Sequence, residues 1–279
     1  MTLYEENYTG KEILKIAIRI FLFLMCLIVL APLVVMLSSA FKIDSEIYDF
    51  PMRLFPKNPT FENFIQLKEW FPIYTWNSIK LTSIIVIVQL ITATTGAYAF
   101  AKLKWKGRDF VFMLYVVSIM IPLQSIIIPQ FLVIRNLGLY NTHLALIFTG
   151  AFTAFGTFLI KQYFMTIPHS YSEAAHIDGA NDFVIFFKII LPLAKPVFAT
   201  QIIFAFRFFW NDFFGPLIYI TSQKLKTLPL GMSDFATEFY VYKGPQMAAS
   251  LISIIPVMII FLMAQKYFVE GVAATGVKG

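Results

Sequence analysis

Six long apolar runs dominate the chain and limit what it can fold into. Each run is long enough for a helix to cross a bilayer, which takes roughly 20 residues. Inside a bilayer only helices and closed barrels satisfy their own backbone groups, and these runs lack the alternation of barrel strands. The sequence therefore predicts an all-α polytopic membrane protein with six transmembrane helices, at about 16–41, 78–101, 110–134, 137–160, 197–220 and 245–266.

The composition agrees with this class and excludes several functions. The 279 residues are 58% hydrophobic and only 14% charged, whereas soluble domains carry about 25% charged residues. The single cysteine, Cys26, excludes an internal disulfide and a cysteine-based metal site. No catalytic set of histidines or carboxylates, no G-x-x-x-x-G-K-[ST] phosphate loop and no basic run is found. We expect a chain that is not an enzyme, holds no metal or cofactor and binds no nucleic acid.

The orientation follows from the short loop Lys102–Arg108, which holds four basic residues in seven. Short loops rich in lysine and arginine face the cytoplasm. Since the spans alternate in direction, the N-terminal tail (1–15), the segment 168–196 and the C-terminal tail (270–279) are predicted to be cytoplasmic as well. The membrane domain between the tails is predicted to extend over residues 16–269.

The polar segment 168–196 lies between two apolar runs and is predicted to form two short helices at the membrane surface. Ser170 and Glu173 have capping-box spacing, so the first helix should start at Ser170. Ala174 and Ala175 continue it and leave a surface with little side-chain bulk, which another protein can approach closely.

Gly179 permits the backbone bend that should end this first helix. Either Asn181 or the following aspartate can cap a second run, Phe183–Leu191, which is too short to cross a bilayer. Pro192 and Pro196 are predicted to stop that run.

The pattern E-A-A-x-x-D-G-A, followed by F and then I-x-L-P, resembles the EAA loop of the membrane subunits of binding-protein-dependent ABC importers. In that family the loop is a coupling helix that docks in a cleft of a cytoplasmic ATPase. The resemblance implies an ATPase-coupling role for Glu173, Ala174, Ala175, Asp178, Gly179, Ala180, Leu191 and Pro192. Glu173 could pair with a basic residue at the cleft rim, act only in the capping box, or do both. Asp178 could cap or hydrogen-bond the turn.

Further stretches along the chain resemble one branch of that family, the shorter maltose-type sugar permeases. These stretches are ENF (62–64), NS (77–78), IPLQSIIIPQF (121–131), LGLYNT (137–142), FWNDFFGPL (209–217), TLPLGM (227–232) and QKYFVEGVAATGVKG (265–279). The resemblance implies the type I ABC importer permease fold in a bacterial or archaeal cell membrane. It also implies a heterodimer with a second permease, two ATPase subunits that use ATP and Mg²⁺, and an extracytoplasmic sugar-binding protein.

Polar residues inside the spans are candidates for the translocation path. Charged groups within a membrane are costly and usually face a cavity or a partner. On this ground Arg207, Trp210, Asn211, Asp212 and Gln124 are predicted to face the path, where polar groups would meet sugar hydroxyls and aromatic rings would meet CH faces. Arg207 could instead snorkel or pair with the second permease. For Gln89, Gln124 and Gln201 the default expectation is hydrogen bonds between helices.

The sequence does not name the cargo, which could be glycerol phosphate, a polyol or an alginate oligosaccharide instead of a neutral sugar. An ion-driven secondary transporter would show inverted repeats, and none is seen. The external loops with ENF and TLPLGM could be structural or could receive an external partner. Prolines at 32, 122, 129, 216 and 256 indicate either ordinary kinks or helices bent around a cavity.

Overall fold

The computed structural model describes residues 2–51, 53–235 and 242–276, and these residues are almost wholly helical, with no strand among them. The side chains described begin at residue 12 and end, with gaps, at residue 265. The chain divides into two units, Met1–Glu69 with Phe235–Ile252, and Trp70–Asp234 with Ser253–Gly279. Residues 277–279 of the predicted C-terminal tail lie outside the described residues.

The first unit is built around one long apolar helix and the loop that follows it. Its helices are α1 (Thr2–Ala40), α2 (Asp44–Ile47), α3 (Glu62–Ile65), η1 (Gln66–Lys68) and the start of α15 (Lys243–Gly276).

Asn63, in the ENF stretch, closes the end of α1. Its buried amide donates to the carbonyl oxygens of Ala40 at 3.0 Å and Lys42 at 2.7 Å. These carbonyls would otherwise lack a partner at the helix end. The ENF stretch therefore has a structural role within this unit.

The second unit contains the remaining helices. They are α4 (Phe71–Ala101), α5 (Arg108–Val117), η2 (Ser118–Met120), α6 (Leu123–Asn136), α7 (His143–Gly150), α8 (Ala154–Thr166), α9 (Ser170–Ile177), α10 (Asp182–Ile185), the π-helix η3 (Phe186–Ile190), α11 (Leu191–Leu193), α12 (Lys195–Trp210), α13 (Phe214–Tyr219), η4 (Gln223–Leu225), α14 (Leu228–Met232) and η5 (Ser233–Phe235). The last residue of η5 belongs to the first unit, and the part of α15 from Ser253 onwards belongs to the second.

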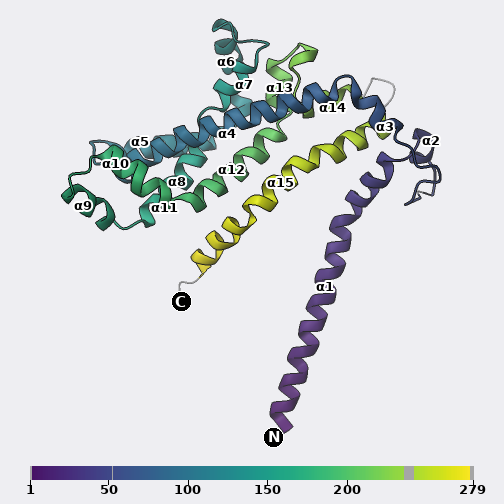
Figure 1. The fold of residues 1–279 in the computed structure, drawn as a ribbon, viewed down its shortest axis with the longest axis horizontal. Coiled ribbons are helices and arrows are strands. Elements are labelled where there is room, and N and C mark those ends of the chain that lie inside the picture. Colours follow the sequence, from purple (N-terminus) through teal and green to yellow (C-terminus); the bar gives the residue numbers. More distant parts are fainter. Residues whose placement is uncertain (1, 52, 236–241, 277–279) are drawn as a thin grey trace. The chain divides into compact units, whose positions relative to one another are not determined.

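Helix α4 is the axis of the second unit, and α8 and α12 run beside it (Figure 1). Ala93 and Ala97 on α4 are fully buried against this neighbourhood. Small side chains let helix backbones approach closely, which is how helices associate where lipid removes the hydrophobic driving force. The packing of α4, α8 and α12 therefore forms the frame that carries the cavity and the α9–α10 segment described below.

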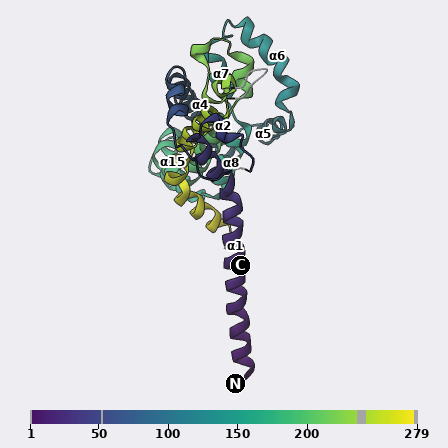
Figure 2. The ribbon, with the colours of Figure 1, turned by 90° about the vertical axis from the view of Figure 1, so that its right-hand side faces the viewer.

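Among the described residues, three unbroken helices have the length and composition to cross a membrane, and there are six such segments if each bent helix pair counts as one. The unbroken ones are Glu12–Ala40, Phe71–Ala101 and Lys243–Met263. The other three are bent pairs: Arg108–Met120 with Leu123–Asn136, bent by 102°, His143–Gly150 with Ala154–Thr166, bent by 40°, and Asp182–Leu193 with Lys195–Trp210, bent by 75°. Figure 2 shows the sharp turn between α5 and α6.

The breaks have local causes that hydropathy does not reveal. At the break between α5 and α6, Ile121 is extended because the proline after it disfavours helical backbone in the preceding residue. Pro122 itself is extended as well. The fourth segment starts at His143, later than predicted, because Gly138 and Asn141 adopt left-handed φ angles of 69° and 57° and form a loop. In contrast, Pro129 and Pro256 lie inside continuous helices.

The NS and TLPLGM stretches pack against each other. Asn77 on α4 donates to the carbonyl oxygens of Lys224 at 2.9 Å and Lys226 at 3.0 Å, and Ser78 Oγ accepts from the Leu228 amide at 2.7 Å. Gly231 is buried against the ring of Tyr74. These contacts fix the stretch before α14 to the beginning of α4, which gives both motifs a structural role.

We expect Gly231→Ala to destabilise the second unit, because a Cβ atom there would overlap the Tyr74 ring. Overpacking of this kind costs about 1–3 kcal/mol. Thermal unfolding of the purified protein in detergent measures the loss. In a Tyr74→Ala background the same glycine substitution should cost much less, and equal costs in both backgrounds would contradict the assigned contact.

Candidate functional site

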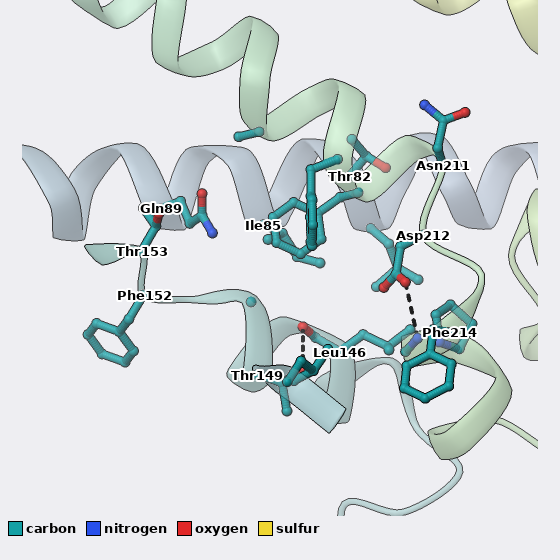
Figure 3. Close-up of a pocket in the computed structure, with 18 of the residues that line it drawn as sticks. Thr82, Ile85, Gln89, Leu146, Thr149, Phe152, Thr153, Asn211, Asp212 and Phe214 are labelled. Atoms are coloured by element: carbon teal, nitrogen blue, oxygen red, sulfur yellow. Dashed lines mark hydrogen bonds between the residues drawn. The ribbon is translucent and has the colours of Figure 1, made fainter. Parts of the chain in front are cut away.

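The second unit contains a half-open cavity of about 1280 Å³. It lies against α4, the α7–α8 connection and the end of α12 (Figure 3). Its walls combine polar side chains with several phenylalanines. The combination suits a ligand that has both hydroxyl groups and apolar faces.

Helix α4 contributes one polar strip to the cavity. Ser78, Thr82, Ile85 and Gln89 all line it, at spacings that place them on one helix face. Figure 3 shows Thr82, Ile85 and Gln89 along the side that faces Leu146 and Thr149 of α7. The sequence prediction missed Ser78 and Thr82 as lining residues, although polar residues at helical spacing in an apolar span could have indicated them.

A glutamine pair joins α12 to α4 at the cavity wall. The buried Gln201 amide donates to Gln89 Oε1 at 3.4 Å. Gly156 on α8 leaves room for it, since a Cβ atom there would lie 2.5 Å from Gln201 Nε2. The expected helix-to-helix hydrogen bond is therefore present for Gln89 and Gln201. Gln124, at the start of α6, instead lines the cavity and is exposed.

Two opposite charges, Arg207 and Asp212, line the cavity. No carboxylate lies within ion-pair distance of Arg207 among the described residues. Asp212 Oδ1 accepts from the Gly215 amide at 3.1 Å, and a Cβ atom at Gly215 would lie 2.5 Å from Asp212 Oδ2. Gly215 thus allows the carboxylate to sit at the N-terminus of α13 while remaining at the cavity wall.

The structure separates the residues that were predicted to face the path in the fifth span. Arg207, Asn211 and Asp212 line the cavity, although α12 ends at Trp210 and the last two lie in the link to α13. Trp210 does not line it. Its side chain is 2% exposed, stacks on Phe206 and donates from Nε1 to the carbonyl oxygen of Ser253 on α15 at 3.0 Å. The side of α12 that carries Trp210 therefore packs against α15.

A second candidate surface is the α9–α10 segment, which is also in the second unit (Figure 1). Helix α9 begins at Ser170, as predicted, but the capping box is absent. His169 occupies the N-cap position without a side-chain hydrogen bond, and the Glu173 amide bonds to the His169 carbonyl oxygen. Ser170 is thus already inside the helix, and the exposed Glu173 carboxylate has no partner among the described residues.

The turn after α9 has the predicted form. Gly179 has a φ of +82°, which other residues adopt at a cost, and Asn181 Oδ1 accepts from the Val184 amide at 2.9 Å to cap α10. The Asp178 carboxylate is exposed and makes no hydrogen bond to the turn among the described residues.

The two adjacent alanines of the motif, Ala174 and Ala175, face different ways. Ala174 is exposed, whereas Ala175 is only 9% exposed and packs in a core cluster with Ile185 and Ile190. Ala180 and Leu191 are half-buried against the same cluster. Only Ala174 of these four is therefore openly available to a partner. Beside the turn, Ile177 and Phe183 are 86% and 76% exposed.

The prolines of this segment do not stop the second helix as predicted. Pro192 is exposed and lies within α11, in the first turn, and Pro196 lies in the first turn of α12. Pro196 is tolerated because the amide it lacks would have no helical partner at the start of α12. Pro192 lies in a continuous helical path, just after the π-helix η3. The helical path from Asp182 instead bends at Ala194 and continues into α12.

Side chains of α4 and α8 fix the segment at several points. Tyr98 Oη donates to the Asp182 carbonyl oxygen at 3.2 Å, and its ring packs 4.8 Å from that of Phe186. Lys102 Nζ donates to the Ile167 carbonyl oxygen at 2.8 Å, and burial lowers the pKa of this amine. Tyr163 Oη donates to the Leu193 carbonyl oxygen at 3.1 Å. A displacement of this segment would therefore be transmitted to α4 and α8.

We expect Tyr98→Phe to loosen the anchoring of α10. Losing one hydrogen bond destabilises the folded state by about 1 kcal/mol. Amide exchange in residues 180–190 should therefore accelerate roughly five-fold. Hydrogen–deuterium exchange with mass spectrometry measures this. Tyr171→Phe is the matched control, because Tyr171 is exposed. Equal exchange in the two variants would show that the Tyr98 contact does not restrain the segment.

Comparison with known proteins gives consistent matches over most of the chain. Residues 90–273 match the family model described as "Binding-protein-dependent transport system inner membrane component". The Bacillus subtilis arabinooligosaccharides transport system permease protein AraQ is 32% identical over 273 residues, which cover 96% of this chain and 97% of AraQ. The B. subtilis galactooligosaccharides transport system permease protein GanQ is 36% identical over 234 residues, covering 81% and 83%.

A solved structure is also similar to the chain over most of its length. It is a chain of a bacterial ABC transporter involved in the import of the acidic polysaccharide alginate, with a TM-score of 0.83 and 27% identity. The match covers 93% of this chain and 98% of that one.

Proposed function

Since the chain belongs to the family of binding-protein-dependent transport system inner membrane components, we propose that it is the permease subunit of an ATP-driven importer of a sugar or oligosaccharide. The chain has the type I ABC importer permease fold and is a transport subunit and not an enzyme. The observation that carries the proposal is the family match over residues 90–273, a range that contains both the α9–α10 segment and most of the cavity wall.

The cavity supports a sugar as cargo. Its polar side chains can hydrogen-bond hydroxyl groups, and its phenylalanines, among them Phe204 and Phe208, offer flat surfaces for the CH faces of sugar rings. AraQ and GanQ are named for oligosaccharide transport, which supports the same class for this chain. In the proposed role Arg207, Asn211, Asp212 and Gln124 face the path that this chain shares with a second permease.

An acidic oligosaccharide is the second candidate cargo. Arg207 lines the cavity without a carboxylate partner among the described residues, and the similar solved structure comes from an importer of an acidic polysaccharide. Uptake of neutral and uronic-acid oligosaccharides by the same cells distinguishes the two. An ion-driven transporter is set aside, because the family is defined by dependence on a binding protein.

The α9–α10 segment is proposed as the coupling element that docks on a cytoplasmic ATPase. Two ATPase subunits would bind ATP and Mg²⁺, a second permease would complete the membrane part, and an extracytoplasmic binding protein would deliver the cargo. The anchors at Tyr98, Lys102 and Tyr163 would pass the motion of the ATPases to α4 and α8. The exposed Ile177 and Phe183 would supply apolar contact, with Glu173 and Ala174 beside them.

We expect Glu173→Lys and Gly179→Asp to impair coupling. The first reverses an exposed charge, and the second adds both a charge and backbone strain at a left-handed position. Co-purification of the transporter and ATP hydrolysis stimulated by its binding protein measure the effect, which should be at least ten-fold, or about 1.4 kcal/mol.

Glu62→Lys, an equal charge reversal at an exposed residue of the first unit, is the control. The second permease should still co-purify with every variant. Full ATPase association and stimulation in both loop variants would refute the coupling role.

We expect Asp212→Asn to reduce uptake while leaving the stimulated ATP hydrolysis nearly unchanged. A hydrogen bond to a charged group contributes about 1.5–3 kcal/mol, so loss of one from the cargo should lower uptake roughly ten-fold or more. Gly215→Ala should act similarly by displacing the carboxylate. Uptake of labelled oligosaccharide into proteoliposomes is the measurement, with the exposed Asp49→Asn as control. Unchanged uptake in Asp212→Asn would remove this residue from the path.

A further inference from the structure

The connection between α4 and α5, residues 102–108, carries basic and aromatic side chains beyond the Lys102 anchor assigned to coupling above. It contains Lys102, Lys104, Lys106 and Arg108, with Trp105 between them. Lys102 is engaged with the Ile167 carbonyl oxygen, while Lys104 and Lys106 are exposed. Neither of these two has a carboxylate within ion-pair distance among the described residues.

A shallow hollow of about 440 Å³ lies at this connection. It is lined by Lys104, Trp105, Gly107, Arg108, Asp109 and Phe110. Gly107 has a left-handed φ of +83°, which turns the chain sharply into α5. The turn thus places Lys104, which precedes it, and Arg108 and Phe110, which follow it in α5, around the same hollow.

Arg108 is held in a fixed position at the hollow. Its Nε donates to Asp109 Oδ1 at 2.8 Å and its Nη1 donates to the Leu103 carbonyl oxygen at 3.4 Å. Asp109 is the one acidic lining residue, and this ion pair offsets its charge. The charged residues that line the hollow, Lys104, Arg108 and Asp109, therefore leave a net positive charge there.

The hollow also has an aromatic and apolar rim, formed by Trp105 and Phe110. Phe110 is 61% exposed, and the Trp105 ring packs on Phe100 while its Nε1 donates to the Ala99 carbonyl oxygen at 3.2 Å. The apolar surface continues along α5 through the exposed Val111, Met113 and Leu114. Tryptophan favours the boundary between headgroups and acyl chains. A rim of this composition suits the level at which a bilayer's polar and apolar layers meet.

We propose that this hollow binds an anionic phospholipid, with its headgroup phosphate between Lys104 and Arg108 and an acyl chain along α5. Basic hollows at the ends of membrane helices suit acidic headgroups, and each basic residue near an anionic surface contributes about 1 kcal/mol. The continuous apolar rim favours a lipid over a free phosphate ion, because a free ion would have no use for it. The proposal is independent of the cargo and of the ATPase.

The test uses the assembled transporter and phosphatidylglycerol with brominated acyl chains, which quench nearby tryptophan fluorescence. The fluorescence of Trp105 is obtained by subtracting the signal of the Trp105→Phe variant from that of the unchanged transporter. We expect brominated phosphatidylglycerol to quench Trp105 at a concentration at least ten-fold below that of brominated phosphatidylcholine. In Lys104→Gln/Lys106→Gln this preference should disappear, and in Lys104→Arg/Lys106→Arg it should persist, which shows that the charge and not the fold is responsible.

Lys57→Gln/Lys68→Gln removes the same charge from exposed positions of the first unit and should keep the preference. Three results would overturn the proposal. The two brominated lipids could quench equally well, or inorganic phosphate at equal concentration could displace phosphatidylglycerol, which would identify a free anion site. Finally, the glutamine variant could lose ATPase association while its quenching stays unchanged, which would identify an acidic protein surface as the occupant.

Discussion

The requirement that every backbone group find a partner inside the bilayer controls the architecture of the second unit. Each break in a membrane-crossing helix frees amides and carbonyls that lipid cannot satisfy. The structure meets this need with single polar side chains. Thr153 Oγ1 accepts from the Gly156 amide at 3.0 Å, and Thr92 Oγ1 donates to the Ala151 carbonyl oxygen at 2.7 Å across the α7–α8 break. Asp212 does the same for Gly215 where α13 begins.

These breaks coincide with the candidate sites because irregular backbone within a membrane is tolerated only where it is buried in protein or lines a cavity. The α7–α8 break and the link after α12 both line the large cavity, and the bend at Ala194 follows the α9–α10 segment. Helix α4 is unbroken and serves both sites. Its middle presents Thr82 and Gln89 to the cavity, and its end presents Tyr98 to α10. One rigid element therefore links the surface proposed for coupling to the proposed path.

Hydropathy was sufficient to predict the six crossings, because the energetic cost of placing charge in lipid marks each span directly. It could not predict the breaks, since both halves of a bent pair are equally apolar. Local rules worked where the cause is local. Gly179 takes the left-handed turn and Asn181 caps α10 as predicted. The local rules failed for the capping box, because His169 and not Ser170 occupies the N-cap position of α9.

The sequence by itself determined the membrane class, the family and the position of the α9–α10 segment, because these depend on composition, on motif order and on local backbone preferences. Only the tertiary structure decided which polar residues share a site. Trp210 and Arg207 lie on one helix, yet one packs against α15 and the other lines the cavity. Ala174 and Ala175 are neighbours, yet one is exposed and the other is buried. The physical reason is that helix geometry sets the direction in which a side chain points, whereas only the packing of neighbouring helices decides whether that side is buried, exposed or open to a cavity.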